Sequence, residues 1–149
     1  QIDEERLAQI VDILTQIIRL QIQNQLLIQK AFELSLHFYQ LDIHLMMTDQ
    51  IVSFYLEACS EYLSAKNQEI AYIVAQILQF LIKRMDFNQM QIFLKKCTFF
   101  IRLYADRSST VFHLGHQLYH ILEENSQEID SFIVESFHHS CNHCSCDEC

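Results

Sequence analysis

The near absence of glycine and proline is the feature of this sequence that most limits its fold. The 149 residues include no proline and one glycine, Gly115. Tight turns, hairpins and long loops rely on these two residue types, because glycine adopts positive φ and proline fixes φ. Helices joined by short polar linkers need few of them. The sequence therefore predicts an all-α fold, and its length suits one domain.

The first forty residues carry apolar side chains at alternating spacings of three and four. This series is interrupted once, by an asparagine, and comprises Ile10, Ile13, Ile17, Leu20, Asn24, Leu27, Ala31, Leu34, Phe38 and Leu41. The heptad spacing predicts a long N-terminal helix, or two collinear helices, with one apolar seam. Asn24 within such a seam either fixes the register of a coiled-coil dimer or lies near a surface or kink of a monomer. A homodimer through the N-terminal helix therefore stays open.

Capping residues divide the rest of the chain into shorter helices. We expect helices from Thr48 to about residue 65, Asn67 to about 85, Asp86 or Asn88 to about 104, Ser108 or Ser109 to about 125, and Ser126 to about 137. The short linkers require each helix to lie antiparallel to the preceding one. The helix after Asn67 is apolar on nearly every face, so it should be covered on several sides. The prediction is thus a long N-terminal helix followed by about five antiparallel helices.

Three phenylalanines in register indicate an internal repeat. Phe54, Phe93 and Phe132 stand 39 residues apart, and each follows a glutamine or glutamate by four positions. Over residues 48 to about 137, this unit of two helices resembles the HEAT and armadillo class of α-solenoid. The resemblance implies helix pairs that bury their faces by stacking on the next pair, and a compact helical bundle is the alternative. Residues 1–137 are accordingly predicted to form one α-helical domain.

The last twelve residues, HHSCNHCSCDEC, form a tail rich in potential metal ligands. The candidates are Cys141, Cys144, Cys146, Cys149, His138, His139 and His143. Zinc takes four cysteine or histidine ligands tetrahedrally, and paired Cys-x-x-Cys units are common ligand sets. Because one residue separates the two pairs, three cysteines with one histidine are easier to arrange than four sulfurs. We interpret residues 138–149 as a tail with a structural zinc site, and a disulfide or an unliganded tail are the alternatives.

Histidines also gather on one expected helix. His113, His116 and His120 fall opposite the apolar stripe that contains Leu114, so they are expected to face solvent. Arg107 and His113 form an Arg-x5-His pair that resembles the Arg/His element of the HEPN family, small all-α RNases and nucleotide-binding proteins. That resemblance implies metal-free RNA cleavage as the alternative function. The sequence contains no glycine-rich phosphate loop, nucleophile elbow or His-Glu-x-x-His motif.

Charge, hydropathy and cysteine usage indicate which partners and which cellular compartment to expect. The formal net charge is −9, and no lysine or arginine follows Arg107, which disfavours nucleic acid. No apolar run approaches the length of a membrane span, so no membrane partner is expected. Cys59 and Cys97 lie on apolar helix stretches, which makes them ordinary buried side chains and favours a reducing, intracellular location, cytoplasmic or nuclear.

Together these features predict a non-enzymatic protein interaction or scaffold module that is part of a larger protein or complex. Its partner is expected to be a helix or an extended peptide in an apolar groove between successive helices. Phe99, Phe100 and Tyr104 are the predicted partner-binding anchors, because they crowd beyond what one buried stripe requires.

Overall fold

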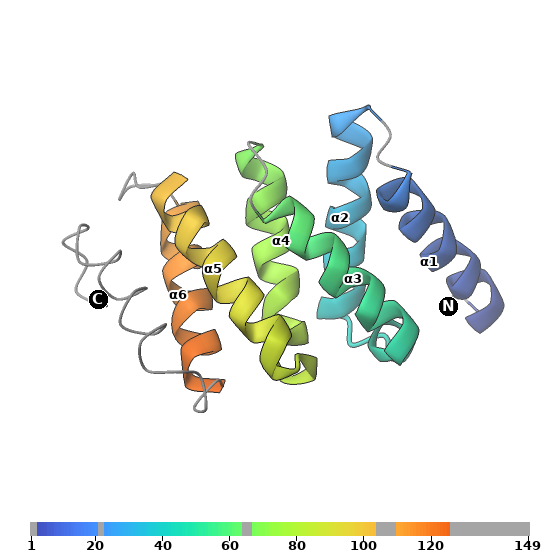
Figure 1. The fold of residues 1–149 in the computed structure, drawn as a ribbon. Helices are drawn as coiled ribbons and strands as arrows, with labels where there is room; N and C mark the ends of the chain where they lie inside the picture. Colours follow the sequence, from blue (N-terminus) through green and yellow to red (C-terminus); the bar gives the residue numbers. More distant parts are fainter. Residues whose placement is uncertain (1–2, 21–22, 64–66, 104–109, 126–149) are drawn as a thin grey trace.

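The computed structural model describes residues 3–20, 23–63, 67–103 and 110–125, and its regular elements are all helical (Figure 1). These elements are α1 (Glu4–Arg19), α2 (Gln25–Gln40), the short 3-10 helix η1 (His44–Met47), α3 (Asp49–Tyr62), α4 (Gln68–Leu81), the 3-10 helix η2 (Ile82–Arg84), α5 (Phe87–Leu103) and α6 (Thr110–Asn125). The all-α prediction is confirmed. The helix expected from Ser126 to about residue 137 lies outside the described residues.

Short polar side chains start the helices at the expected places. The side-chain oxygen of Asn67 accepts hydrogen bonds from the backbone N–H groups of Glu69 and Ile70, at 3.0 and 3.2 Å. Asp86 accepts from the N–H of Gln89, whose side chain accepts from the N–H of Asp86 in return. Both arrangements satisfy N–H groups that have no partner within the helix. The predicted starts at Asn67 and Asp86 are therefore confirmed.

The N-terminal apolar series is divided between two helices. Asn24 is the N-cap of α2, where its side chain accepts a hydrogen bond from the N–H of Leu27 at 3.2 Å. α1 and α2 contact each other side by side and run in opposite directions (Figure 1). The single long helix and the two collinear helices are both wrong. A heptad series has the same spacing in one helix as in a hairpin, and Asn24 decides between them because it caps a new helix.

Three antiparallel helix pairs follow one another across the molecule in chain order. The pairs are α1 with α2, α3 with α4, and α5 with α6. α4 also contacts α2 and α6, so α2, α4 and α6 form one layer. α3 contacts α1 and α5, so these three form a second layer, with α3 crossing in front of α4 and α5 in front of α6 in Figure 1. Within each of the three pairs, the two helices run in opposite directions (Figure 1).

The central helix α4 is covered from three directions, as its sequence predicts. It packs between α2 and α6 and beneath α3, and its buried side chains are Ile70, Ala71, Ile73, Val74, Ala75, Ile77, Leu78 and Leu81. Burial of each of the isoleucine, valine and leucine side chains contributes roughly 1.5–3 kcal/mol relative to exposure. The core therefore runs along α4 and extends to both of its neighbouring pairs.

The single glycine of the chain lies on the face of α6 that packs against α5. A Cβ atom at Gly115 would stand 2.6 Å from Cδ1 and 2.7 Å from Cε1 of Phe100, and 3.3 Å from Cγ1 of Ile101. The Phe100 ring is fully buried. Gly115 therefore serves the packing of two helices, and its backbone remains helical.

Candidate functional site

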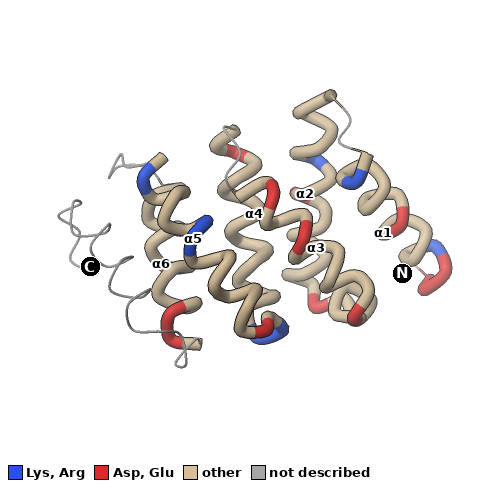
Figure 2. The backbone as a smooth tube through the Cα atoms, in the orientation of Figure 1, with Lys and Arg blue, Asp and Glu red and all other residues tan. Residues whose placement is uncertain are grey.

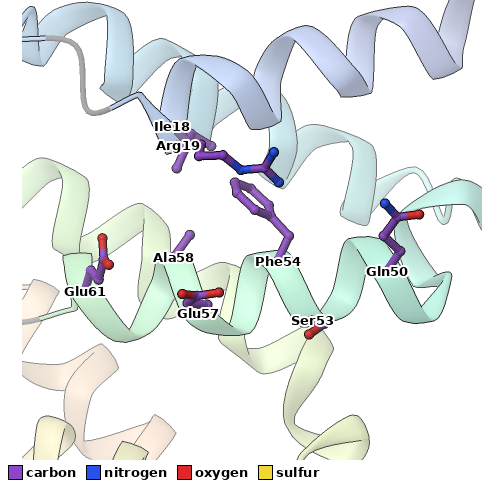
Figure 3. Close-up of a pocket in the computed structure, with 8 residues that line it drawn as sticks. All are labelled: Ile18, Arg19, Gln50, Ser53, Phe54, Glu57, Ala58 and Glu61. Atoms are coloured by element: carbon purple, nitrogen blue, oxygen red, sulfur yellow. The ribbon is translucent and has the colours of Figure 1, made fainter.

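A groove lies between α1 and α3 on the layer that these helices share with α5. It has a volume of about 460 Å³ and is lined by Ile18, Arg19, Gln50, Ser53, Phe54, Glu57, Ala58 and Glu61 (Figure 3). The Arg19 guanidinium carbon lies 5.3 Å from the centroid of the Phe54 ring, which is a cation–π contact between α1 and α3. Figure 3 shows the Arg19 side chain reaching over that ring. Because Arg19 and Phe54 both line the groove, this contact forms part of its wall.

A second groove of about 440 Å³ lies between α3 and α5. Its lining residues are Ser53, Leu56, Glu57, Ser60, Glu61, Gln89, Ile92 and Phe93. Three of them, Ser53, Glu57 and Glu61, also line the first groove. Their spacing of four residues places them on one face of α3, which we name the α3 ridge. The two grooves therefore adjoin along this ridge and together cross the layer from α1 to α5.

The charges on this layer are unevenly distributed. The α3 ridge carries the exposed carboxylates of Glu57 and Glu61, whereas α5 carries Lys95, Lys96 and Arg102. Figure 2 shows acidic positions along α3 and basic positions along α5. A groove with two carboxylates, serine hydroxyls and apolar walls can accept a chain that presents both cationic and apolar side chains. Neither groove contains a nucleophile next to a histidine base.

The three predicted anchor residues do not share one environment. Phe99 is 49% exposed on α5, and Ile92, seven residues earlier on the same face, is equally exposed. Phe100 is fully buried against Gly115, so the prediction that it contacts a partner is wrong. One residue along a helix turns a side chain by about 100°, which separates Phe100 from Phe99. Tyr104 lies outside the described residues.

The histidines of α6 also differ from one another. His113 is exposed and His120 is partly buried, but His116 is fully buried, with its ring centroid 4.6 Å from that of Phe112. The expectation that all three face solvent is therefore wrong for His116. The buried arc of α6 is wider than one apolar stripe, because this helix contacts α4, α5 and η2. Nδ1 of His120 lies 3.9 Å from a carboxylate oxygen of Glu123.

Metal binding by the described ranges has no structural support. Within these ranges, no three histidine, cysteine, aspartate or glutamate side chains come together to hold an ion. Cys59 and Cys97 are fully buried free thiols, and burial raises the pKa of both thiols above the ordinary value. A protonated, inaccessible thiol is a poor nucleophile and a poor metal ligand. Both cysteines are therefore core residues, as the sequence predicts.

Several predicted site residues lie outside the described ranges. They are Arg107 and the seven candidate zinc ligands, Cys141, Cys144, Cys146, Cys149, His138, His139 and His143. The zinc site and the RNA-cleavage alternative therefore stay predictions from the sequence.

Sequence reasoning missed the α3 ridge and Ile92. The ridge becomes recognisable only when α1 and α5 flank α3, because its residues are ordinary polar positions of an amphipathic helix. Ile92 had a signal: it precedes Phe99 by seven residues, with Lys95 and Lys96 between them. An apolar pair on the charged side of a helix indicates an exposed apolar surface.

The chain matches no protein-family model, no curated protein and no solved structure. In the part of the chain that the structure describes, no helix combines the length and the apolar character needed to cross a membrane.

Proposed function

We propose that this protein is a non-enzymatic interaction module that binds an extended peptide segment of a partner protein across α1, α3 and α5. The observation that carries the proposal is the pair of adjoining grooves that share the α3 ridge. An extended chain that crosses both grooves would contact three successive helix pairs. The HEAT and armadillo solenoids, to which the sequence shows a resemblance of period, present continuous surfaces of this kind to their partners.

Charge complementarity defines the chemistry of the partner segment. The α3 ridge places Glu57 and Glu61 beside both grooves, and the chain carries a formal net charge of −9. A segment with lysine or arginine side chains would neutralise the ridge and would be steered towards an acidic protein. We therefore assign the grooves to a segment that combines basic and apolar residues.

Phe99 and Ile92 supply an apolar contact next to the α3–α5 groove. Ile92 lines that groove, and Phe99 lies two turns further along the same face of α5. An aromatic side chain that is half exposed in the free protein gains apolar burial when a partner covers it. Phe99 is thus the one anchor predicted from the sequence that remains accessible in the described structure.

Selection from a displayed peptide library on the immobilised full chain tests the proposal. We expect enriched peptides that carry lysine or arginine next to an apolar residue. The double substitution Glu57→Gln and Glu61→Gln should weaken their binding about tenfold or more, because two charge-assisted contacts are lost. Glu69→Gln with Glu124→Gln is the matched control, because it removes two exposed carboxylates from the other layer. Absence of any enriched peptide, or equal loss in both double variants, refutes the proposal.

The tail has a separate proposed role. We infer from its seven cysteine and histidine residues that residues 138–149 bind zinc structurally. This inference depends on the residue pattern alone and is independent of the grooves.

A further inference from the structure

Half of the N-terminal apolar series remains exposed in the folded chain. At one heptad position, Ala31 and Phe38 are buried, and Ile10 and Ile17 are partly buried against the core. At the other position every residue is exposed, with fractions of 55% for Ile13, 69% for Leu20, 38% for Leu27, 38% for Leu34 and 58% for Leu41. These five residues stand at successive intervals of seven. The packing of α1 on α2 therefore uses one side of the series and leaves the other side uncovered.

The five exposed residues lie at one end of the molecule. Residues seven apart on a helix share a face, so Ile13 with Leu20, and Leu27 with Leu34 and Leu41, form two columns. α1 packs against α2 and α3, and α2 packs against α1 and α4, so this pair is the first of the three (Figure 1). We name the surface formed by these five residues the end face.

The area of the end face matches the requirement of a dimer. With about 200 Å² for a fully exposed leucine or isoleucine, the five fractions correspond to roughly 500 Å² of apolar surface. That value lies near the upper limit for a patch on a soluble monomer, where the largest patches reach about 300–600 Å². Two copies placed end face to end face would bury roughly 1,000 Å² from these side chains alone, which reaches the minimum of a specific interface.

The charge of the surrounding helices also permits a second copy. Residues 3–41, which include α1 and α2, contain three basic residues (Arg6, Arg19 and Lys30) and five acidic residues (Asp3, Glu4, Glu5, Asp12 and Glu33), so their net charge is −2. Lys30 and Glu33 form an ion pair at 3.3 Å within α2. The remaining −7 of the formal charge of −9 belongs to the rest of the chain. Two acidic molecules can approach through this region with little of the repulsion that other surfaces would impose.

We propose that the end face is the interface of a homodimer. The occupant of the exposed apolar columns is the same surface of a second copy, related by a two-fold axis, so that each copy covers the columns of the other. This interface lies on α1 and α2, away from the α3–α5 groove. The dimer therefore leaves that groove accessible, whereas the α1–α3 groove lies beside the interface, because its lining residue Arg19 is adjacent to Leu20. The dimer proposal does not depend on peptide binding.

Sedimentation of the full chain under reducing conditions tests the dimer. We expect the wild type to sediment as a dimer with a dissociation constant in the micromolar range or below. The double substitution Ile13→Glu and Leu34→Glu should weaken association at least about a hundredfold, because it places four carboxylates in the interface. Both side chains are exposed in the single chain, so circular dichroism should remain that of the wild type.

Phe87→Glu with Leu103→Glu is the matched control, since these side chains are 45% and 42% exposed on α5. This control variant should remain dimeric. A wild type that is monomeric at every concentration refutes the proposal, as do dimers that persist in the Ile13→Glu and Leu34→Glu variant. Open-ended assemblies, or a monomer that captures a different protein through these residues, also refute it. Peptide binding by the monomeric variant should stay unchanged, so failure of the dimer and failure of the groove are separate results.

Discussion

Replacement of Gly115 by alanine gives a sharp test of the packing between α5 and α6. In an unconstrained helix interior, Gly→Ala raises the free energy of unfolding by about 1 kcal/mol. Here the new Cβ would stand 2.6 Å from Cδ1 of the fully buried Phe100 ring, closer than atoms in contact can lie. The ring is enclosed by core residues and cannot turn away freely, so overpacking should cost about 2–3 kcal/mol. The net expectation is a loss of about 1–2 kcal/mol.

Urea denaturation followed by far-UV circular dichroism measures this loss. A second background separates the two opposing effects. In Phe100→Val, both the Cδ and the Cε atoms that meet the new Cβ are absent, so Gly115→Ala should raise stability by up to about 1 kcal/mol relative to Phe100→Val alone. The sign of the alanine effect should therefore reverse between the two backgrounds. Stabilisation of the wild type by Gly115→Ala, or additive effects in the double variant, would show that the described packing of α5 on α6 is incorrect.

The remaining predictions concern the core, its titration, the tail and the surface. The Tyr39 hydroxyl is buried with no hydrogen-bond partner among the described residues, whereas the Tyr55 hydroxyl forms a hydrogen bond with the Ser35 hydroxyl. In urea denaturation, Tyr39→Phe should therefore raise the free energy of unfolding by up to about 1 kcal/mol, and Tyr55→Phe should lower it by about 1 kcal/mol. Burial raises the pKa of both tyrosines above the ordinary value of 10.0, so the unfolded chain loses these protons at a lower pH than the folded chain does. The contribution of these two groups to the free energy of unfolding should therefore be constant below pH 10 and should fall above pH 10 by about 1.4 kcal/mol per pH unit for each tyrosine. This slope should be smaller in Tyr39→Phe, which has one of the two groups. Elemental analysis of reduced protein should find about one zinc per chain, and removal of residues 138–149 should abolish it, whereas less than about a tenth of an equivalent contradicts the zinc site. Phe99→Ala should change the free energy of unfolding by less than about 0.5 kcal/mol, yet weaken the selected peptides severalfold in fluorescence anisotropy.

Local signals explain which parts of the fold were predictable. Asn67 and Asp86 cap helices through hydrogen bonds to residues two or three positions away, so their role is legible without tertiary structure. The uniformly apolar α4 sequence likewise indicates a helix covered on several sides, wherever its neighbours lie. These features depend on short stretches of chain, and the structure confirms them.

Tertiary packing decided the features that sequence reasoning missed. The heptad series is compatible with one helix or with a hairpin, and only the cap at Asn24 distinguishes them. Phe100 and His116 were expected at the surface, but α5 and α6 bury arcs wider than a single apolar stripe because each packs against more than one element. The candidate site was less predictable than the fold. The α3 ridge acquires its grooves from α1 and α5, which are distant in sequence.

Mapping of a selected basic peptide onto the isotope-labelled protein by backbone amide chemical shifts tests the central claim most directly. We expect the amide resonances of Ser53, Glu57, Glu61 and Ile92 to shift or broaden as the peptide is added. The amide resonances of α2 and α6, which belong to the other layer, should not change. Perturbations confined to the α2, α4 and α6 layer, or to the tail, would contradict the assignment of the partner to α1, α3 and α5.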